Sequence, residues 1–170
     1  MAKAASKAPA ARTFKTSVDI PAGDRTKVNA ILNQNLADAF DLMSQAKQAH
    51  WNVKGNEFFQ LHKLFDELAA EVGEWVDMVA ERVTALGGYA TGTARMAAAS
   101  SQLPEFPTST TGGMEHVRVV ADRLGAYTNY AREAIHQTDK LGDANTADLF
   151  TEISRCADKY LYFLEAHLQG

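Results

Sequence analysis

The chain has 170 residues, enough for about one domain with a buried core, and its 46% hydrophobic and 22% charged residues are ordinary for a globular protein. A single cysteine excludes a framework of intrachain disulfides and favours a reducing compartment, the cytoplasm. No apolar run reaches the roughly 18 residues that a membrane-spanning helix needs, so we expect no membrane partner.

Charge is distributed unevenly along the chain. Residues 1–15 contain no acidic residue and four basic ones, whereas the rest contains 13 basic and 21 acidic residues; the four are Lys3, Lys7, Arg12 and Lys15. This pattern predicts a mobile basic arm, residues 1–22, on an acidic domain, residues 23–170. Such an arm can contact DNA phosphates without sequence specificity. A solubilising tail that binds nothing is the alternative, and a transit peptide is a less favoured one.

Four stretches of helical periodicity follow the arm. They run from about Asp24 to Asn52, from an Asn56 cap to Leu86, from Met114 to Lys140, and from an Asn145 cap to Leu164. Glycines 87 and 88 are typical of a left-handed cap at the end of the second helix. The connection 89–113 is long for a loop, and a short helix is expected around residues 94–100. The prediction is an all-α, ferritin-like four-helix bundle with a long crossover between its second and third helices.

Five side chains suited to metal binding lie in or just before the second helix: His50, His62, Asp66, Asp77 and Glu81. The spacing of four residues puts His62 with Asp66, and Asp77 with Glu81, on one stripe of the helix. The two pairs are roughly 16 Å apart along the axis, at about 1.5 Å per residue, so one ion cannot contact both. An antiparallel copy related by a two-fold axis would bring the pairs together in two identical sites, and His50 could complete the first pair.

Four segments resemble, in order, those of the Dps family, the DNA-binding proteins from starved cells or miniferritins. They read KQAHWNVKG at 47–55, LHKLFDEL at 61–68, DMVAERVTALGG at 77–88 and TADLFTEISRCADKYLYFLE at 146–165. The resemblance covers about residues 24–168 and leaves only the arm outside it. It implies a homododecameric cage that oxidises Fe(II), preferably with hydrogen peroxide rather than dioxygen, and stores Fe(III) mineral, protecting DNA from oxidative damage.

The resemblance also implies roles for particular residues. His50, His62 and Asp66 of one chain would form a ferroxidase centre with Asp77 and Glu81 of the two-fold partner. Trp51 matches a tryptophan beside the family's site and is a candidate redox neighbour. Near the start of the fourth helix, Asp143 and Asp148 could line an acidic entry pore for iron, or they could simply cap the helix.

Simpler interpretations accompany each assignment. Asp77 and Glu81 taken alone could form a solvated helix face, and a lone His50 beside a tryptophan is more often structural. Other ferritin-like di-iron sites use a Glu-x-x-His motif on each of two helices, and this chain has the motif only once, at Glu133 and His136. His116, His136 and His167 are expected at the surface, and Cys156 is expected to be a small core residue. The main alternative function is a nucleoid-associated protein that compacts DNA through its arm.

Overall fold

The computed structural model describes residues 12–169, and its five elements are all α-helices. They are α1 (Ala22–Asn52), α2 (Phe58–Ala85), α3 (Ala94–Ser100), α4 (Gly113–Lys140) and α5 (Ala144–Ala166). The described residues form no strand. The predicted all-α, ferritin-like bundle with one short extra helix is confirmed.

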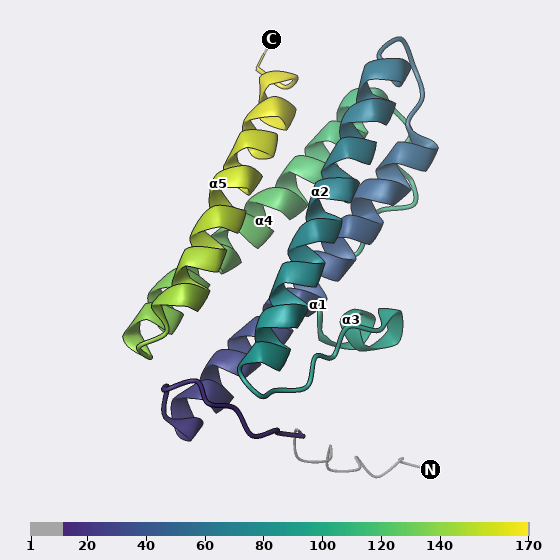
Figure 1. The fold of residues 1–170 in the computed structure, drawn as a ribbon. Helices are drawn as coiled ribbons and strands as arrows, with labels where there is room; N and C mark the ends of the chain where they lie inside the picture. Colours follow the sequence, from purple (N-terminus) through teal and green to yellow (C-terminus); the bar gives the residue numbers. More distant parts are fainter. Residues whose placement is uncertain (1–11, 170) are drawn as a thin grey trace, which may run out of the picture.

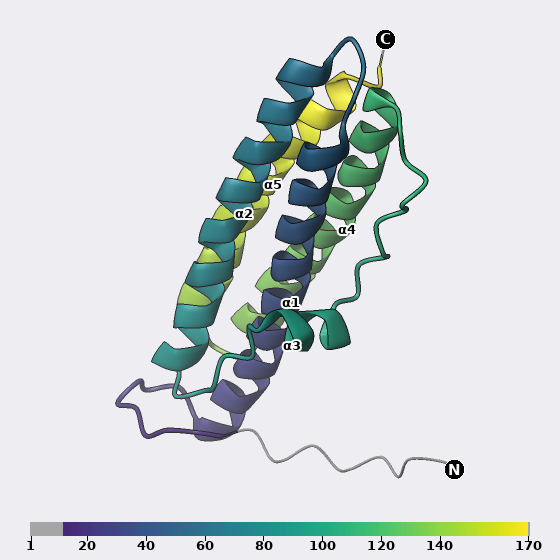
Figure 2. The ribbon, with the colours of Figure 1, turned by 90° about the vertical axis from the view of Figure 1, so that its right-hand side faces the viewer.

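The four long helices form two antiparallel pairs, α1 with α2 and α4 with α5 (Figure 1). The crossover runs the length of the bundle, so that α2 and α4 point in the same direction, and α3 lies outside the bundle beside α1 (Figure 2). The inward faces bury a continuous apolar core, whose large members include Leu32, Phe65, Trp75, Tyr127 and Phe150. Burial of these faces supplies most of the stabilisation that helix propensity alone cannot.

Most helix ends lie within two residues of their predicted positions, but two caps differ. The predicted Asn56 cap is wrong, because Glu57 precedes α2 and makes no side-chain capping bond. The predicted Asn145 cap is also wrong: Asp143 caps α5, and its carboxylate accepts a hydrogen bond from the backbone N–H of Thr146. Gly87 follows α2 with φ +77°, as predicted for a left-handed cap.

The second half of the predicted arm lies against the bundle. We call residues 12–20 the docked segment. The backbone N–H of Phe14 donates to the carbonyl of Gly87 at 2.7 Å, and Arg25 of α1 donates to the carbonyls of Val18 and Ile20. This part of the arm is therefore held at the ends of α1 and α2, whereas Lys3 and Lys7 lie outside the described residues.

The prediction that His116 lies at the surface is wrong. Its side chain is fully buried at the start of α4, Nδ1 donates to the carbonyl of Gly112 at 2.8 Å, and the crossover places Phe106 against the ring. The crossover covers this position, which helical periodicity alone could not show. His136 and His167 are exposed, as predicted.

Candidate metal centre

The two predicted histidine ligands meet at the turn between α1 and α2. His50 Nδ1 lies 2.7 Å from the carbonyl oxygen of His62, and His62 Nδ1 lies 2.8 Å from the carbonyl oxygen of His50. A carbonyl only accepts hydrogen bonds, so both Nδ1 atoms carry the proton. The rings stack with centroids 3.7 Å apart. In the neutral tautomer each Nε2 then keeps its lone pair for a metal ion, an orientation typical of histidine ligands.

Asp66 lies one turn after His62 on α2 and extends toward the same histidine pair. Its Oδ1 is 4.0 Å from His50 Nε2, so these three predicted ligands occupy one place on the subunit. Lys47 of α1 also contacts this oxygen, with Nζ at 2.5 Å. The Lys47 hydrogen bond holds the pKa of the Asp66 carboxyl below its ordinary value. The carboxylate is 53% exposed and already ionised, which suits it to a cation that displaces the ammonium.

Sequence reasoning missed Lys47. The residue lies three positions before His50 on α1, and this spacing places it on the same helix face. That signal was available, but the contact depends on how closely α1 and α2 approach, which sequence spacing does not determine.

The second predicted ligand pair, Asp77 and Glu81, lies farther along α2 and is exposed. It is separated from Asp66 by about three helical turns, or roughly 16 Å at about 1.5 Å per residue. Within residues 12–169 of one subunit, no group of three or more His, Cys, Asp and Glu side chains is placed to hold a metal ion. The structure stacks His50 on His62 and places Asp66 near His50, but in a single subunit these three side chains are not arranged to hold a metal ion, and Asp77 and Glu81 lie apart from them.

Trp51 follows His50 in the chain and is 61% exposed. Its side chain lines a hollow of about 540 Å³ between α1 and the crossover, which Gln45 and Phe106 also line. The indole is therefore open to solvent on the side of α1 that faces the crossover.

Of the two candidate pore residues, Asp143 is engaged inside the subunit. Its side chain is 1% exposed, caps α5 and accepts a hydrogen bond from Arg82 Nη2 at 2.7 Å. Arg82 also donates to Thr146 Oγ1, so the end of α2 is joined to the start of α5. The structure places Asp143 in the capping role that the sequence left open. Asp148 is exposed one turn later and stays a candidate pore residue.

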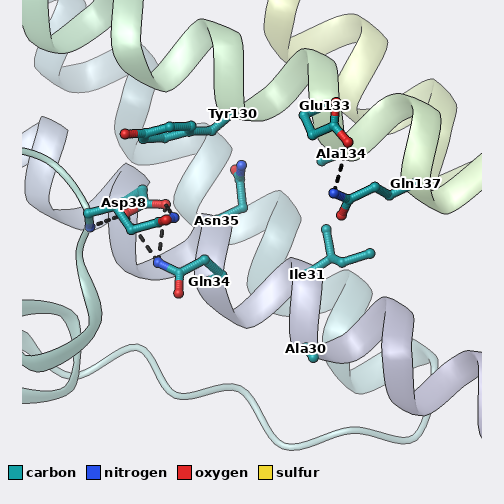
Figure 3. Close-up of a pocket in the computed structure, with 10 residues that line it drawn as sticks. Ala30, Ile31, Gln34, Asn35, Asp38, Tyr130, Glu133, Ala134 and Gln137 are labelled. Carbon is teal, nitrogen blue, oxygen red and sulfur yellow. Dashed lines mark hydrogen bonds between the residues drawn. The ribbon is translucent and has the colours of Figure 1, made fainter.

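A separate pocket of about 360 Å³ lies between α1 and α4 and contains none of the predicted ligands (Figure 3). Its most notable residue is Asp38, which is fully buried and accepts hydrogen bonds from Gln34 and from the backbone N–H of Gln102. Burial raises the pKa of Asp38 above its ordinary value. The bond from Gln102 attaches the crossover to α1, so Asp38 has a structural role that the sequence pattern did not indicate.

The fold and the comparisons with known proteins define the class of protein. The family model of the ferritin-like domain matches residues 29–170. The DNA protection during starvation protein of Agrobacterium fabrum is 40% identical over 158 residues, which cover 93% of this chain and 98% of that protein. The chain belongs to the Dps family of ferritin-like proteins.

Solved structures show the same architecture. DpsC from Streptomyces coelicolor is 30% identical, with a TM-score of 0.88 and coverage of 93% of this chain and 92% of that one. A Dps homologue from the archaeon Halobacterium salinarum is 26% identical, with a TM-score of 0.88 and coverage of 99% and 93%. In the part of the chain that the structure describes, no helix is long and apolar enough to cross a membrane.

Proposed function

We propose that the protein is a ferroxidase and iron store: a homododecameric cage that oxidises Fe(II), preferably with hydrogen peroxide, and retains Fe(III) mineral. The observation that supports this most is the reciprocal pair of hydrogen bonds between His50 and His62. These bonds leave the Nε2 lone pair of each ring free to bind a metal ion, with Asp66 close to His50 Nε2. Imidazole nitrogen and carboxylate oxygen suit iron, and the absence of thiolate from the set disfavours structural zinc.

The complete centre is shared between two subunits in this proposal. Asp77 and Glu81 of a two-fold partner would face His50, His62 and Asp66, since one helix cannot bring both groups to one ion. Two Fe(II) ions held close together can deliver two electrons to one hydrogen peroxide, giving two Fe(III) and two hydroxide ions. Both electrons then transfer without release of free hydroxyl radical. This chemistry would protect nearby DNA, the activity for which the Agrobacterium relative is named.

Trp51 would serve the same centre as an auxiliary electron donor. Its exposed indole can give one electron when the supply of Fe(II) is too small for complete reduction of peroxide. We expect its oxidation to spare residues of the core when peroxide exceeds iron.

The test begins with purified protein that is mixed anaerobically with Fe(II) and then given sub-stoichiometric hydrogen peroxide. Ferric absorbance is followed beside a measurement of particle size. Fast oxidation in a particle of about twelve chains, the closed assembly expected for this family, is the expected result. A double substitution, Asp77→Ala with Glu81→Ala, should abolish fast oxidation and leave the particle assembled. Unchanged kinetics in that variant would contradict the proposed centre.

DNA binding is a second candidate function, because the docked segment presents Arg12 and Lys15 as exposed cations. With Lys3 and Lys7, each chain adds four positive charges outside an acidic body, and many copies in one cage would bind DNA by multivalency. In this role the protein is cytoplasmic and nucleoid-associated.

The experiment for this second function replaces the four basic residues by glutamine, which keeps the docked segment in place. We expect a gel shift that is salt-sensitive in the wild type and lost in this variant, with normal iron uptake in both. Retained DNA binding at equal salt would move the DNA surface elsewhere.

A further inference from the structure

The buried tryptophan of α2 has an unusual hydrogen-bond partner for a core residue. Trp75 is 2% exposed, and its Nε1–H donates to Oε1 of Glu71, one turn earlier on the same helix, at 3.2 Å. A carboxylate is a much better proton acceptor than the amide and carbonyl groups that usually receive an indole N–H. An indole that loses an electron becomes strongly acidic, so this carboxylate can take the proton at once.

The same carboxylate oxygen has a second oxidisable partner. The thiol of Cys156 on α5 donates to Glu71 Oε1 at 3.1 Å. Burial, with a smaller effect of Glu71, raises the pKa of this thiol to about 11. The sulfur therefore stays protonated at neutral pH and is a poor nucleophile. It can still be oxidised if its electron and proton leave together, and Glu71 is placed to receive the proton.

The other large aromatic ring beside Trp75 lacks such an acceptor. Tyr127 of α4 lies parallel to the indole, with ring centroids 5.8 Å apart and an interplanar angle of 6°. Its hydroxyl donates to the amide oxygen of Asn35, which lines the pocket of Figure 3 and is not basic. Burial raises the pKa of this phenol. An oxidised Tyr127 could not release its proton easily, so an oxidising equivalent shared by the stacked pair should settle on Trp75.

We propose that Trp75, Glu71 and Cys156 form a one-electron relay, which moves an oxidising equivalent from the core to the half-buried thiol. A strong one-electron oxidant removes one electron from Trp75, and the Nε1 proton passes to Glu71. Cys156 then returns one electron to the indole, Nε1 recovers its proton from Glu71, and the thiol proton takes its place on the carboxylate. The product is a Cys156 thiyl radical, which a low-molecular-weight thiol can reduce by donating one hydrogen atom.

The relay rests on the proposed function only for its physiological oxidant, an iron-derived oxidant formed when peroxide exceeds Fe(II). Asp77, a proposed ligand, lies two residues beyond Trp75 on α2, so the relay would begin in the helix that bears the site. It would protect the packed interior, because Trp75 is regenerated and the lasting change falls on a residue that reaches the surface of the α2–α5 pair.

The test uses the full-length, iron-free protein and ruthenium(III) tris-bipyridine, made by a light flash with persulfate as electron acceptor. A spin trap captures thiyl radicals, and mass spectrometry of peptides locates the adduct. We expect the adduct on Cys156 in the wild type and its loss in Trp75→Phe and in Glu71→Gln. Glutamine can still accept both hydrogen bonds but cannot take the proton, so it isolates the proton transfer. In Cys156→Ser, the transient absorption of the indolyl radical should persist longer.

Trp51→Phe is the matched control, since it removes the only other tryptophan of the chain and should keep the Cys156 adduct. Circular dichroism and particle size check that each variant folds, and Glu71→Gln tests the relay even if Trp75→Phe does not fold. An adduct on Cys156 at the wild-type level in Trp75→Phe or in Glu71→Gln would overturn the relay. Absence of the adduct from the wild type would also overturn it. Repeating the experiment with Fe(II) and excess peroxide as the oxidant separates the relay from the proposed ferroxidase activity. If the Cys156 adduct forms with ruthenium(III) but not with Fe(II) and peroxide, the result counts against the ferroxidase proposal alone.

Discussion

Replacement of Asp143 by alanine should destabilise the subunit strongly, because one buried carboxylate has two separate roles. The capping bond to the N–H of Thr146 is worth about 1 kcal/mol, as for other N-caps. The charged hydrogen bond from Arg82 adds roughly 2 kcal/mol, since this guanidinium is only 17% exposed. We expect a loss of about 3 kcal/mol in the free energy of unfolding.

The measurement is urea denaturation at one fixed protein concentration, followed by circular dichroism, because assembly would make the apparent stability depend on concentration. Asp143→Asn should lose less, about 2 kcal/mol, since asparagine is a good N-cap but cannot pair with Arg82 as a charge. The matched control is Asp148→Ala, which changes an exposed carboxylate of the same helix and should stay within about 0.5 kcal/mol.

The two aspartates also separate the structural role from the pore role. If Asp148 lines an entry pore, its alanine variant should slow iron uptake and keep its stability, whereas the main effect of Asp143→Ala is on stability. A loss below about 0.5 kcal/mol in Asp143→Ala would refute the reasoning, because neither the cap nor the ion pair would then contribute as the contacts indicate.

Three further predictions follow from single contacts. Lys47→Gln should tighten anaerobic Fe(II) binding in a titration, since the metal no longer displaces an ammonium from Asp66; unchanged affinity would show that this ion pair opens freely. Gly87→Ala should cost about 2 kcal/mol and expose the docked segment to limited proteolysis, because φ is +77° and the added Cβ would meet a carbonyl oxygen of that segment. Gly142→Ala is its control: φ is similar, but the space is open, so only about 1 kcal/mol should be lost, without proteolysis. Alkylation of Cys156 by iodoacetamide should be slow at pH 8 and accelerate toward pH 11, because only the thiolate reacts and burial raises the thiol pKa; rapid alkylation at pH 8 would contradict this.

Helical periodicity predicted the bundle well because the core depends on it directly. The apolar stripes of the four long helices are the faces that the structure buries, and the crossover helix matches its predicted residues, Ala94–Ser100. Helix caps were harder to predict. Asp143 and Asn145 are both good capping residues, and the choice between them depends on Arg82, which approaches from a distant part of the sequence.

Residues whose environment comes from the crossover could not be placed from sequence spacing. His116 belongs to a helix with an ordinary apolar stripe, and it is buried because Phe106 of the preceding loop covers it. Asp38 resembles a surface residue in the sequence, but its carboxylate holds the backbone of Gln102. In both cases a long, irregular segment decides the burial, and such segments have no periodicity from which their path can be inferred.

The candidate site was partly predictable for a geometric reason. Spacing along α2 showed that two ligand pairs lie on one stripe and cannot serve one ion, which follows from helix geometry alone. Spacing could not show that His50 and His62 orient each other, because that depends on the approach of two helix ends across the turn at Gly55, whose φ is +114°. At this turn the backbone carbonyl of each histidine accepts a hydrogen bond from the ring of the other and fixes its orientation.

A substitution at either histidine should consequently disturb the orientation of both Nε2 atoms, so the effects of the two substitutions on Fe(II) affinity should be non-additive in a double-mutant cycle. Additive effects would show that each ring is held independently of its neighbour.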